Sequence, residues 1–165
     1  MTLPPWAVAT PERRAHIERV VALLDEWARA MGVSDAERAR WVKAAWLHDA
    51  LRDEQRSDEL AHGPRAAARA AHDGERDRGV LDAVRYHTVG YVHWDDVGRM
   101  LYLADFLEPG RPLDATDRAA LTARVPRERD AVLKEVARRR MEWVIRSGHQ
   151  LMPATVGFWN SLASR

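Results

Sequence analysis

Histidine and aspartate side chains occur at several points of this sequence where their surroundings are otherwise apolar. His48 and Asp49 are adjacent at the C-terminal end of the apolar segment 44–51. An ionised aspartate in an apolar setting is costly unless it is paired or bound to a metal. A histidine beside a carboxylate forms a ligand pair suited to iron, manganese or zinc rather than calcium. The dipeptide alone also fits a surface pair at a helix end, so other residues must support the metal interpretation.

Asp105 lies in segment 100–107, the most apolar stretch of the chain. No cationic residue occurs within four positions before it or five after it, so a partner must come from elsewhere in the fold. A buried carboxylate in this position fits a metal ligand, and it also fits a cap on a neighbouring helix.

Three further histidines have settings that fit a ligand. His16 lies one position off the apolar stripe of a predicted helix, His62 precedes a Gly-Pro pair, and His87 ends another predicted helix. Each alone is more often a structural histidine. Their occurrence together with the two aspartates, in a chain without cysteine, favours an oxygen- and nitrogen-ligated metal site.

The order of these residues resembles a known family pattern. His16, then His48-Asp49, then the distant Asp105 resembles the H…HD…D pattern of the HD-domain phosphohydrolase superfamily. The segments 82–90 and 101–111 are similar to the YqeK family of HD proteins, as are His62-Gly-Pro, Pro153-Ala-Thr and Trp159-Asn160. The resemblance covers about residues 14 to 163.

This resemblance implies a dinuclear metal centre and symmetrical cleavage of diadenosine tetraphosphate to two ADP. It places one metal ion on His16, His48, Asp49 and Asp105. Asp49 bridges to a second ion, which also takes His62 and His87. The family usually uses iron, and manganese, cobalt or zinc are possible with these ligands. A bridging hydroxide is then the expected nucleophile, because two ions acidify the water between them.

Arginines near these motifs are candidates for binding substrate phosphates, since a guanidinium can engage two phosphate oxygens at once. Arg52 is the first choice and is given a catalytic role, because it follows Asp49 by three residues, where many HD enzymes have a lysine. The other candidate substrate contacts are Arg85, Thr88, Gly90, Arg99 and Arg111. Solvated arginines and an ordinary loop explain these five positions as well.

Several alternatives stay open. The connector between Asp49 and His62 has only twelve residues, which puts the choice of nucleotide in doubt. The substrate could be a nucleoside monophosphate, an alarmone or a cyclic dinucleotide, and a non-catalytic helical module that binds nucleotide or protein is a further alternative. Trp94 could stack on a nucleobase or pack in the core. The arginine run 138–140 is interpreted as a solvated helix face rather than a nucleic-acid site.

From the bulk composition we expect a soluble protein of the cytoplasm. The 165 residues fit a single domain, with 46% hydrophobic residues and a net charge of +1. This balanced charge does not indicate the strongly basic surface that nucleic-acid binding requires. Neither a signal peptide nor a membrane-spanning segment is predicted. We expect a small-molecule nucleotide as the partner, and the family resemblance makes a homodimer plausible.

The elements that must position these residues are predicted to be helices, which gives an all-α, single HD-domain helical bundle over residues 1–165. Thr10-Pro11-Glu12 starts the first helix and Gly32 stops it, and the capping-box sequence of segment 34–37 starts a second that runs toward Leu51. Further helices are predicted at about 64–71, 77–87, 100–107, 117–124 and 127–146, with a short one from Pro153. Segments 52–59 and 88–93 are predicted to be a connector and a loop.

Overall fold

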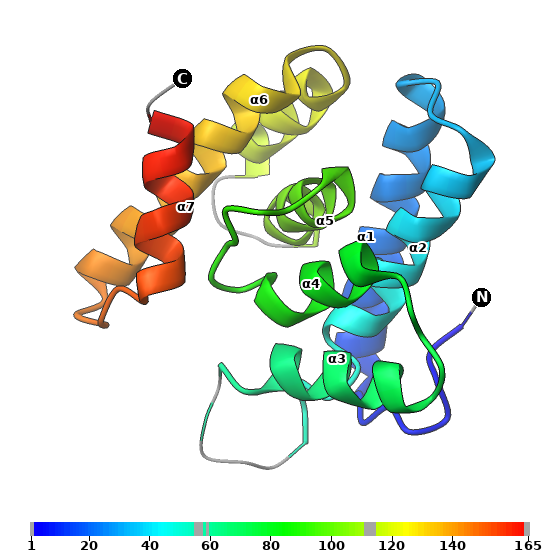
Figure 1. Cartoon of the computed structure of the whole chain (residues 1–165). Coiled ribbons are helices and arrows are strands. Elements are labelled where there is room, and N and C mark those ends of the chain that lie inside the picture. The colour runs from blue at the N-terminus through cyan, green and yellow to red at the C-terminus, as the bar shows by residue number, and fades with distance from the viewer. Residues whose placement is uncertain (1, 55–57, 59, 111–114, 164–165) are drawn as a thin grey trace.

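A computed structural model describes residues 2–54, 58, 60–110 and 115–163 of the chain. The described residues form seven helices and no strand (Figure 1), which confirms the predicted all-α class. No helix among them is long and apolar enough to cross a membrane. The helices are α1 (Pro11–Ala30), α2 (Asp35–His48), α3 (His62–His72), α4 (Arg78–Tyr86), α5 (Asp96–Leu107), α6 (Ala115–Arg146) and α7 (Pro153–Ala163).

The predicted starts of the first two helices are correct. The Thr10 side chain accepts a hydrogen bond from the Arg13 amide at 3.2 Å, and Ser34 accepts one from the Glu37 amide at 3.2 Å. The carboxylate of Glu37 does not complete a capping box, because it accepts hydrogen bonds from side chains within its own helix. Helix α2 ends at His48, short of the predicted Leu51, so Asp49 lies just beyond the helix.

Helix α3 begins two residues earlier than predicted, so that His62 is its first residue. Helix α4 lies within the predicted range, with Asp77 as its N-cap and His87 directly after its last residue. Both histidines therefore sit at helix ends, where the chain changes direction and can present them to a common point.

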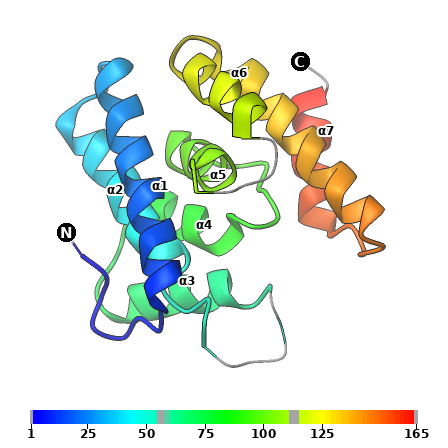
Figure 2. The same cartoon turned by 180° about the vertical axis from the view of Figure 1, so that it is seen from behind.

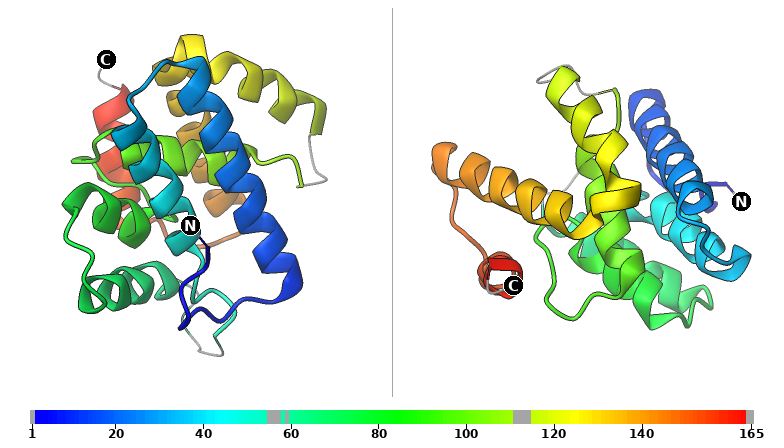
Figure 3. Two further views of the ribbon diagram at one scale, coloured as in Figure 1. Left: turned by 90° about the vertical axis from the view of Figure 1, so that its right-hand side faces the viewer. Right: turned by 90° about the horizontal axis from the view of Figure 1, so that it is seen from above.

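Helix α6 contains two helical parts, as predicted, but they join at Glu128 rather than around residue 125. The helix continues through Pro126 and breaks at Glu128, where φ is −132° and ψ is 35°. Proline lacks an amide hydrogen and its ring crowds the preceding turn, so a break close to it is expected. The second half of α6 takes a different direction from the first (Figure 3).

Helix α5 lies at the centre of the bundle and packs against α1, α2, α4 and α6 (Figures 1 and 2). Nine of its twelve residues are buried, and Asp105 is one of them. The apolar composition of segment 100–107 is explained by this central position. Asp105 is thereby held in the interior at the C-terminal turn of the helix.

Trp94 is a core residue rather than a free stacking platform. Its side chain is 4% exposed, and its Nε1 atom donates a hydrogen bond to the Asp82 carbonyl at 3.0 Å. Its ring packs against the rings of Tyr102 and Phe158, with centroid distances of 5.6 Å and 5.2 Å. Packing therefore accounts for this tryptophan.

Asp77 positions α4 and is expected to make the fold sensitive to acid. It caps Val80 at 3.2 Å and binds Arg40 at 2.6 Å and 3.0 Å. The hydrogen bonds from Arg40 lower the pKa of Asp77 from 3.8 to about 2. Its contribution to stability is therefore present above pH 4 and is lost as pH falls from about 4 toward 2.

Asp77→Asn is accordingly expected to lower the free energy of unfolding by about 1–2 kcal/mol at pH 7, a figure reduced for solvent screening. The difference from wild type should shrink as pH falls from 5 to 3. Urea denaturation across this range measures it. A difference that stays constant with pH would show that the Asp77 ion pair does not carry the effect.

Candidate metal centre

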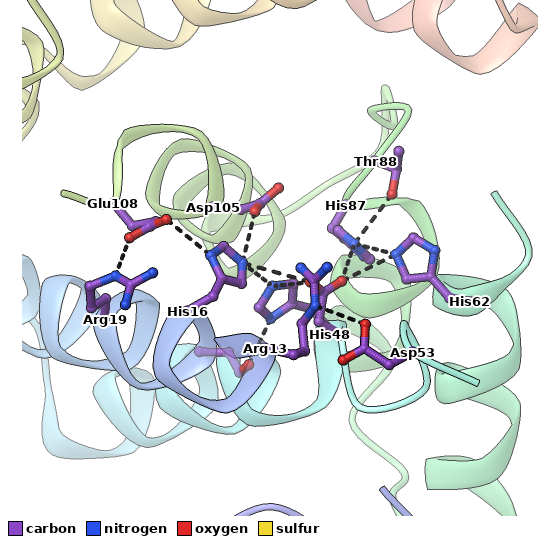
Figure 4. Close-up of polar contacts among 12 residues, drawn as sticks. Arg13, His16, Arg19, His48, Asp53, His62, His87, Thr88, Asp105 and Glu108 are labelled. Atoms are coloured by element: carbon purple, nitrogen blue, oxygen red, sulfur yellow. Dashed lines mark hydrogen bonds and ion pairs between the residues drawn. The ribbon is translucent and has the colours of Figure 1, made fainter. Parts of the chain in front are cut away.

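Six buried side chains from five parts of the chain gather into two adjacent groups (Figure 4). His16, His48 and Asp105 form the first group, and Asp49, His62 and His87 form the second. Within each group, one ligand atom per residue lies within 4.8 Å of the others. These are the six residues that the sequence singled out as metal ligands.

The first group joins three helices. His16 comes from α1, His48 is the last residue of α2, and Asp105 comes from the last turn of α5. The His16 Nε2 atom lies 3.3 Å from Asp105 Oδ1 and 3.3 Å from His48 Nε2. Two imidazole nitrogens and a carboxylate oxygen therefore converge on one point.

The second group forms where α3 begins and α4 ends. The Nε2 atoms of His62 and His87 are 3.0 Å apart. They lie 3.2 Å and 3.4 Å, respectively, from Asp49 Oδ1.

Asp49 lies between the two groups and turns one oxygen toward each. Its Oδ1 atom faces the second group, whereas its Oδ2 atom lies 3.7 Å from both His16 Nε2 and His48 Nε2. Just beyond the end of α2, Asp49 has φ −109° and ψ 15°, which lets its carboxylate project beside the His48 ring. This arrangement fits a carboxylate shared by two ions.

Backbone carbonyls orient two of the imidazoles. The Nδ1 atom of His48 lies 2.7 Å from the Ala45 carbonyl, and that of His87 lies 2.8 Å from the Val84 carbonyl. A carbonyl can only accept, so Nδ1 must donate in both pairs. The Nε2 lone pair of each neutral ring is then left free for a metal.

Glu108 serves the same purpose for His16, and sequence analysis missed it. Its Oε1 atom lies 3.1 Å from His16 Nδ1, while its Oε2 atom accepts hydrogen bonds from Arg19 Nε at 2.5 Å and from the Gly110 amide at 2.7 Å. Glu108 is only 2% exposed. A carboxylate three residues after Asp105 was a usable signal, because positions three apart share a helix face.

Burial and the neighbouring groups together shift the pKa values of these side chains in different directions. Burial opposes charge on His16, but hydrogen bonds to Asp105 and Glu108 raise its pKa to about 9. Burial lowers the pKa of His48 to about 4. Although burial acts against ionisation, the surrounding imidazoles hold the pKa of Asp49 well below 3.8. Neutral imidazoles and ionised carboxylates are the forms that bind a metal.

Arg13 is a second residue that the sequence analysis missed. Its Nη1 atom lies 2.7 Å from Asp49 Oδ2, and its Nε atom lies 3.4 Å from Asp53 Oδ1. Asp53 in turn accepts hydrogen bonds from the amide and hydroxyl of Thr10 at 2.8 Å and 2.9 Å. The start of α1 is thus tied to the segment after Asp49, which fixes Arg13 beside the cluster.

A polar cavity of about 240 Å³ adjoins the second group. Its lining includes Arg52, for which a phosphate contact remains a prediction, and two arginines that the sequence did not single out, Arg13 and Arg65. The full lining is Arg13, Leu51, Arg52, Asp53, Glu54, Asp58, His62 and Arg65.

Among the other residues predicted to contact substrate, Thr88 lies closest to the cluster, with its Oγ1 atom 3.2 Å from His87 Nε2. Arg85 is exposed on α4 and Arg99 is half-buried on α5. Within the described part of the chain, no hydrogen bond or ion pair joins either arginine to the six clustered residues. Arg111 falls outside the described residues.

Gly90 is needed for packing. Its φ is +88°, and a Cβ atom there would lie 2.6 Å from Cδ1 of Phe158. A side chain at this position would clash with α7, and the backbone conformation disfavours residues other than glycine. Contact with α7 therefore explains this glycine without a phosphate.

Comparisons with known proteins agree with this cluster. Residues 13–122 match the family model described as HD domain. The chain therefore belongs to the HD domain family. Together with the clustered histidines and aspartates, this membership indicates binding of divalent metal.

Two relatives share the name of one particular enzyme. The chain is 29% identical over 103 residues to a symmetrical bis(5'-nucleosyl)-tetraphosphatase of Staphylococcus aureus, covering 62% of this chain and 53% of that protein. It is 28% identical over 107 residues to the enzyme of the same name from Bacillus subtilis, covering 64% and 56%. The chain thus spans about half the length of these relatives.

A solved structure supports the fold. The crystal structure of a predicted HD superfamily hydrolase involved in NAD metabolism, from Clostridium acetobutylicum, matches with a TM-score of 0.77. The match covers 94% of this chain and 90% of that chain at 20% sequence identity.

Gly63 controls how closely α3 approaches the end of α4. A Cβ atom there would lie 2.8 Å from the Val84 carbonyl oxygen and 3.2 Å from His87 Cε1. Gly63→Ala is expected to push His62 away from His87 and weaken metal binding at the second group by about 10-fold. Calorimetric titration with Mn²⁺ measures this affinity. Gly157→Ala is the matched control, because nothing lies within 4 Å of that position, and equal affinities for the two variants would contradict the prediction.

Proposed function

We propose that this protein is a metal-dependent phosphohydrolase with a dinuclear centre that cleaves diadenosine tetraphosphate symmetrically into two ADP. The observation that carries the proposal is the position of Asp49, with one carboxylate oxygen toward each of two buried ligand groups. The names of the curated relatives supply the substrate.

His16, His48 and Asp105 would hold one ion, His62 and His87 the other, and Asp49 both. The donors fit a first-row transition metal, because imidazole and carboxylate are present and thiolate is absent from the sequence. Iron is the metal we propose, with manganese, cobalt or zinc as alternatives. When bound, such ions supply Lewis acidity and make an attacking water more acidic.

The chain's own residues prepare the site for a polyanionic substrate. The backbone carbonyls of Ala45 and Val84 fix the rings of His48 and His87, so these ligands need no reorganisation. Arg52 lies in the adjoining cavity with Arg13 and Arg65, where guanidinium groups can bind phosphate oxygens in pairs. Charge that accumulates on those oxygens during reaction is stabilised by such pre-positioned donors.

Symmetrical cleavage is a hydrolysis with a simple balance. The oxygen of one water molecule bonds to one of the two central phosphorus atoms, and the bond from that phosphorus to the oxygen bridging the two central phosphates breaks. Both products are then ADP, and the new terminal phosphate of each ADP can release one proton to solvent. Attack at an outer phosphorus would instead give AMP and ATP.

The test is turnover of the full chain with diadenosine tetraphosphate, after anaerobic loading with Fe²⁺ and in parallel with Mn²⁺. Nucleotide products are separated by chromatography, and bound metal is measured by elemental analysis. About two ions per chain and ADP as the product support the proposal. AMP with ATP would contradict the symmetrical assignment.

A substrate panel covers the alternative chemistry, since several residues of the short connector line the cavity, namely Leu51, Arg52, Asp53, Glu54 and Asp58. Nucleoside monophosphates, alarmone nucleotides and cyclic dinucleotides are tested under the same conditions. Turnover of one of these in place of diadenosine tetraphosphate would keep the metal centre and change the substrate. Metal binding with no turnover of any nucleotide would favour a binding module.

A further inference from the structure

The C-terminal arm, defined as α6 beyond the break at Glu128 together with α7, lies outside the segment that matches the HD domain family. It packs against the rest of the bundle through Phe158, whose ring contacts those of Trp94 and Tyr102. Helix α6 packs against α5, the helix that carries Asp105, and in Figure 3 the arm then extends away from α5. The arm is therefore placed to influence the first ligand group.

One residue of the arm reaches a metal ligand directly. The Nη2 atom of Arg140 lies 2.7 Å from Asp105 Oδ2 and 3.3 Å from the Tyr102 carbonyl oxygen. The other carboxylate oxygen of Asp105, Oδ1, faces His16 in the first group. The two oxygens of Asp105 thus have separate directions, one toward the arm and one toward the cluster.

The position of Arg140 is closely constrained. Its guanidinium carbon lies 4.2 Å from the centre of the Tyr102 ring, which is a favourable cation–π arrangement. The side chain is only 16% exposed, and its Nε atom is buried without a hydrogen-bond partner. Burying a cation in this way is costly unless a carboxylate compensates, and Asp105 provides one. Loss of either partner leaves the other charge buried.

The neighbouring arginines behave differently, which separates Arg140 from the solvated face predicted for segment 138–140. Arg138 and Arg139 pair with Glu135 at 2.7 Å and 2.6 Å. Arg138 is exposed, whereas Arg139 is partly buried and also pairs with Asp117. Only Arg140 of these three pairs with a clustered residue. The interpretation as a solvated face therefore holds for Arg138 and does not hold for Arg140.

We propose that Arg140 is a positioning residue of the metal centre and that the C-terminal arm is part of that centre. Arg140 holds Oδ2, which keeps Oδ1 directed at the first group. This inference rests on the metal centre of the proposed function and makes no assumption about the substrate. Among the described residues of the cluster, Arg140 forms its ion pair with Asp105, so we expect its main effect at the first group.

The test measures Mn²⁺ affinity of each group separately in the full chain. The His62→Ala background leaves the first group intact, and the His16→Ala background leaves the second. In the first background, Arg140→Met is expected to weaken Mn²⁺ binding by about 10- to 100-fold, as for loss of other groups that orient metal ligands. In the second background the change is expected to stay within about 2-fold, because Asp105 is not a ligand there. Arg139→Met is the matched control, with affinities within about 2-fold in both backgrounds.

Arg140→Lys provides a second variant, because it keeps the charge but lacks the planar fork. Its Mn²⁺ affinity at the first group is expected to lie between that of the parent protein and that of Arg140→Met. If Arg140→Met does not fold, Arg140→Lys alone tests whether Arg140 supports metal binding. Unchanged affinity of the first group in a folded variant, or equal losses in both backgrounds, would overturn the inference. A parent protein that binds no Mn²⁺ would overturn the metal centre as well. Metal binding without diadenosine tetraphosphate turnover would overturn only the substrate assignment.

Discussion

Asp49→Asn is expected to lower turnover of diadenosine tetraphosphate by about 10³-fold or more. This is at the upper end of the losses seen when a group that stabilises charge in the transition state is removed. Asparagine has nearly the same shape as aspartate but only one oxygen and no charge. It cannot place an anionic oxygen toward each ligand group, as Asp49 Oδ1 and Oδ2 do. Metal content should fall from about two ions per chain to one or fewer.

The measurement combines steady-state kinetics with elemental analysis, and circular dichroism confirms that the variant is folded. Asp73→Asn is the matched control, because Asp73 is an exposed residue after α3 whose ion pairs lie outside the cluster. It should retain wild-type turnover and metal content. Two tightly bound ions in Asp49→Asn would show that this carboxylate does not join the two groups.

The sequence was sufficient to predict most of the helices because they depend on local patterns, and it indicated the six clustered residues through their settings and their order. Caps such as Thr10 and Ser34 define helix starts through bonds three residues away. The six ligands were found because histidine and aspartate stand out in apolar surroundings and because their order resembles a family. The break in α6 was misplaced by two or three residues, since Pro126 disturbs a helix without fixing the residue at which its geometry fails.

The residues around the ligands were harder to predict because their partners are distant in sequence. Asp105 was recognised as a carboxylate in need of a cation, but Arg140 is 35 residues away on another helix. Arg13 was hidden in a charged first turn, and its link to Asp49 spans 36 residues. Glu108 was also missed, although it lies close in sequence to a ligand. Such contacts follow from how α1, α5 and α6 pack, which no single segment encodes.

His87→Ala is expected to remove the ion of the second group and to lower turnover by about 10²- to 10³-fold. The His87 Nε2 atom faces Asp49 Oδ1 and His62, so its loss leaves a two-residue site that binds metal weakly. The first group should keep its affinity within about 2-fold, because its contacts with Asp49 use the other oxygen, Oδ2. Titration with Mn²⁺ and steady-state kinetics on the same sample measure both effects.

His72→Ala is the matched control for His87→Ala, because the His72 side chain is 82% exposed at the end of α3. It should leave both affinities and turnover unchanged. The comparison separates two mechanisms. In one, the first group alone performs the hydrolysis; in the other, the reaction requires an ion in each group. A His87→Ala variant with one ion and full turnover would mean that the first group alone performs the hydrolysis and that the second is structural. Loss of turnover with the first ion still bound means that the reaction requires both, as the shared position of Asp49 implies.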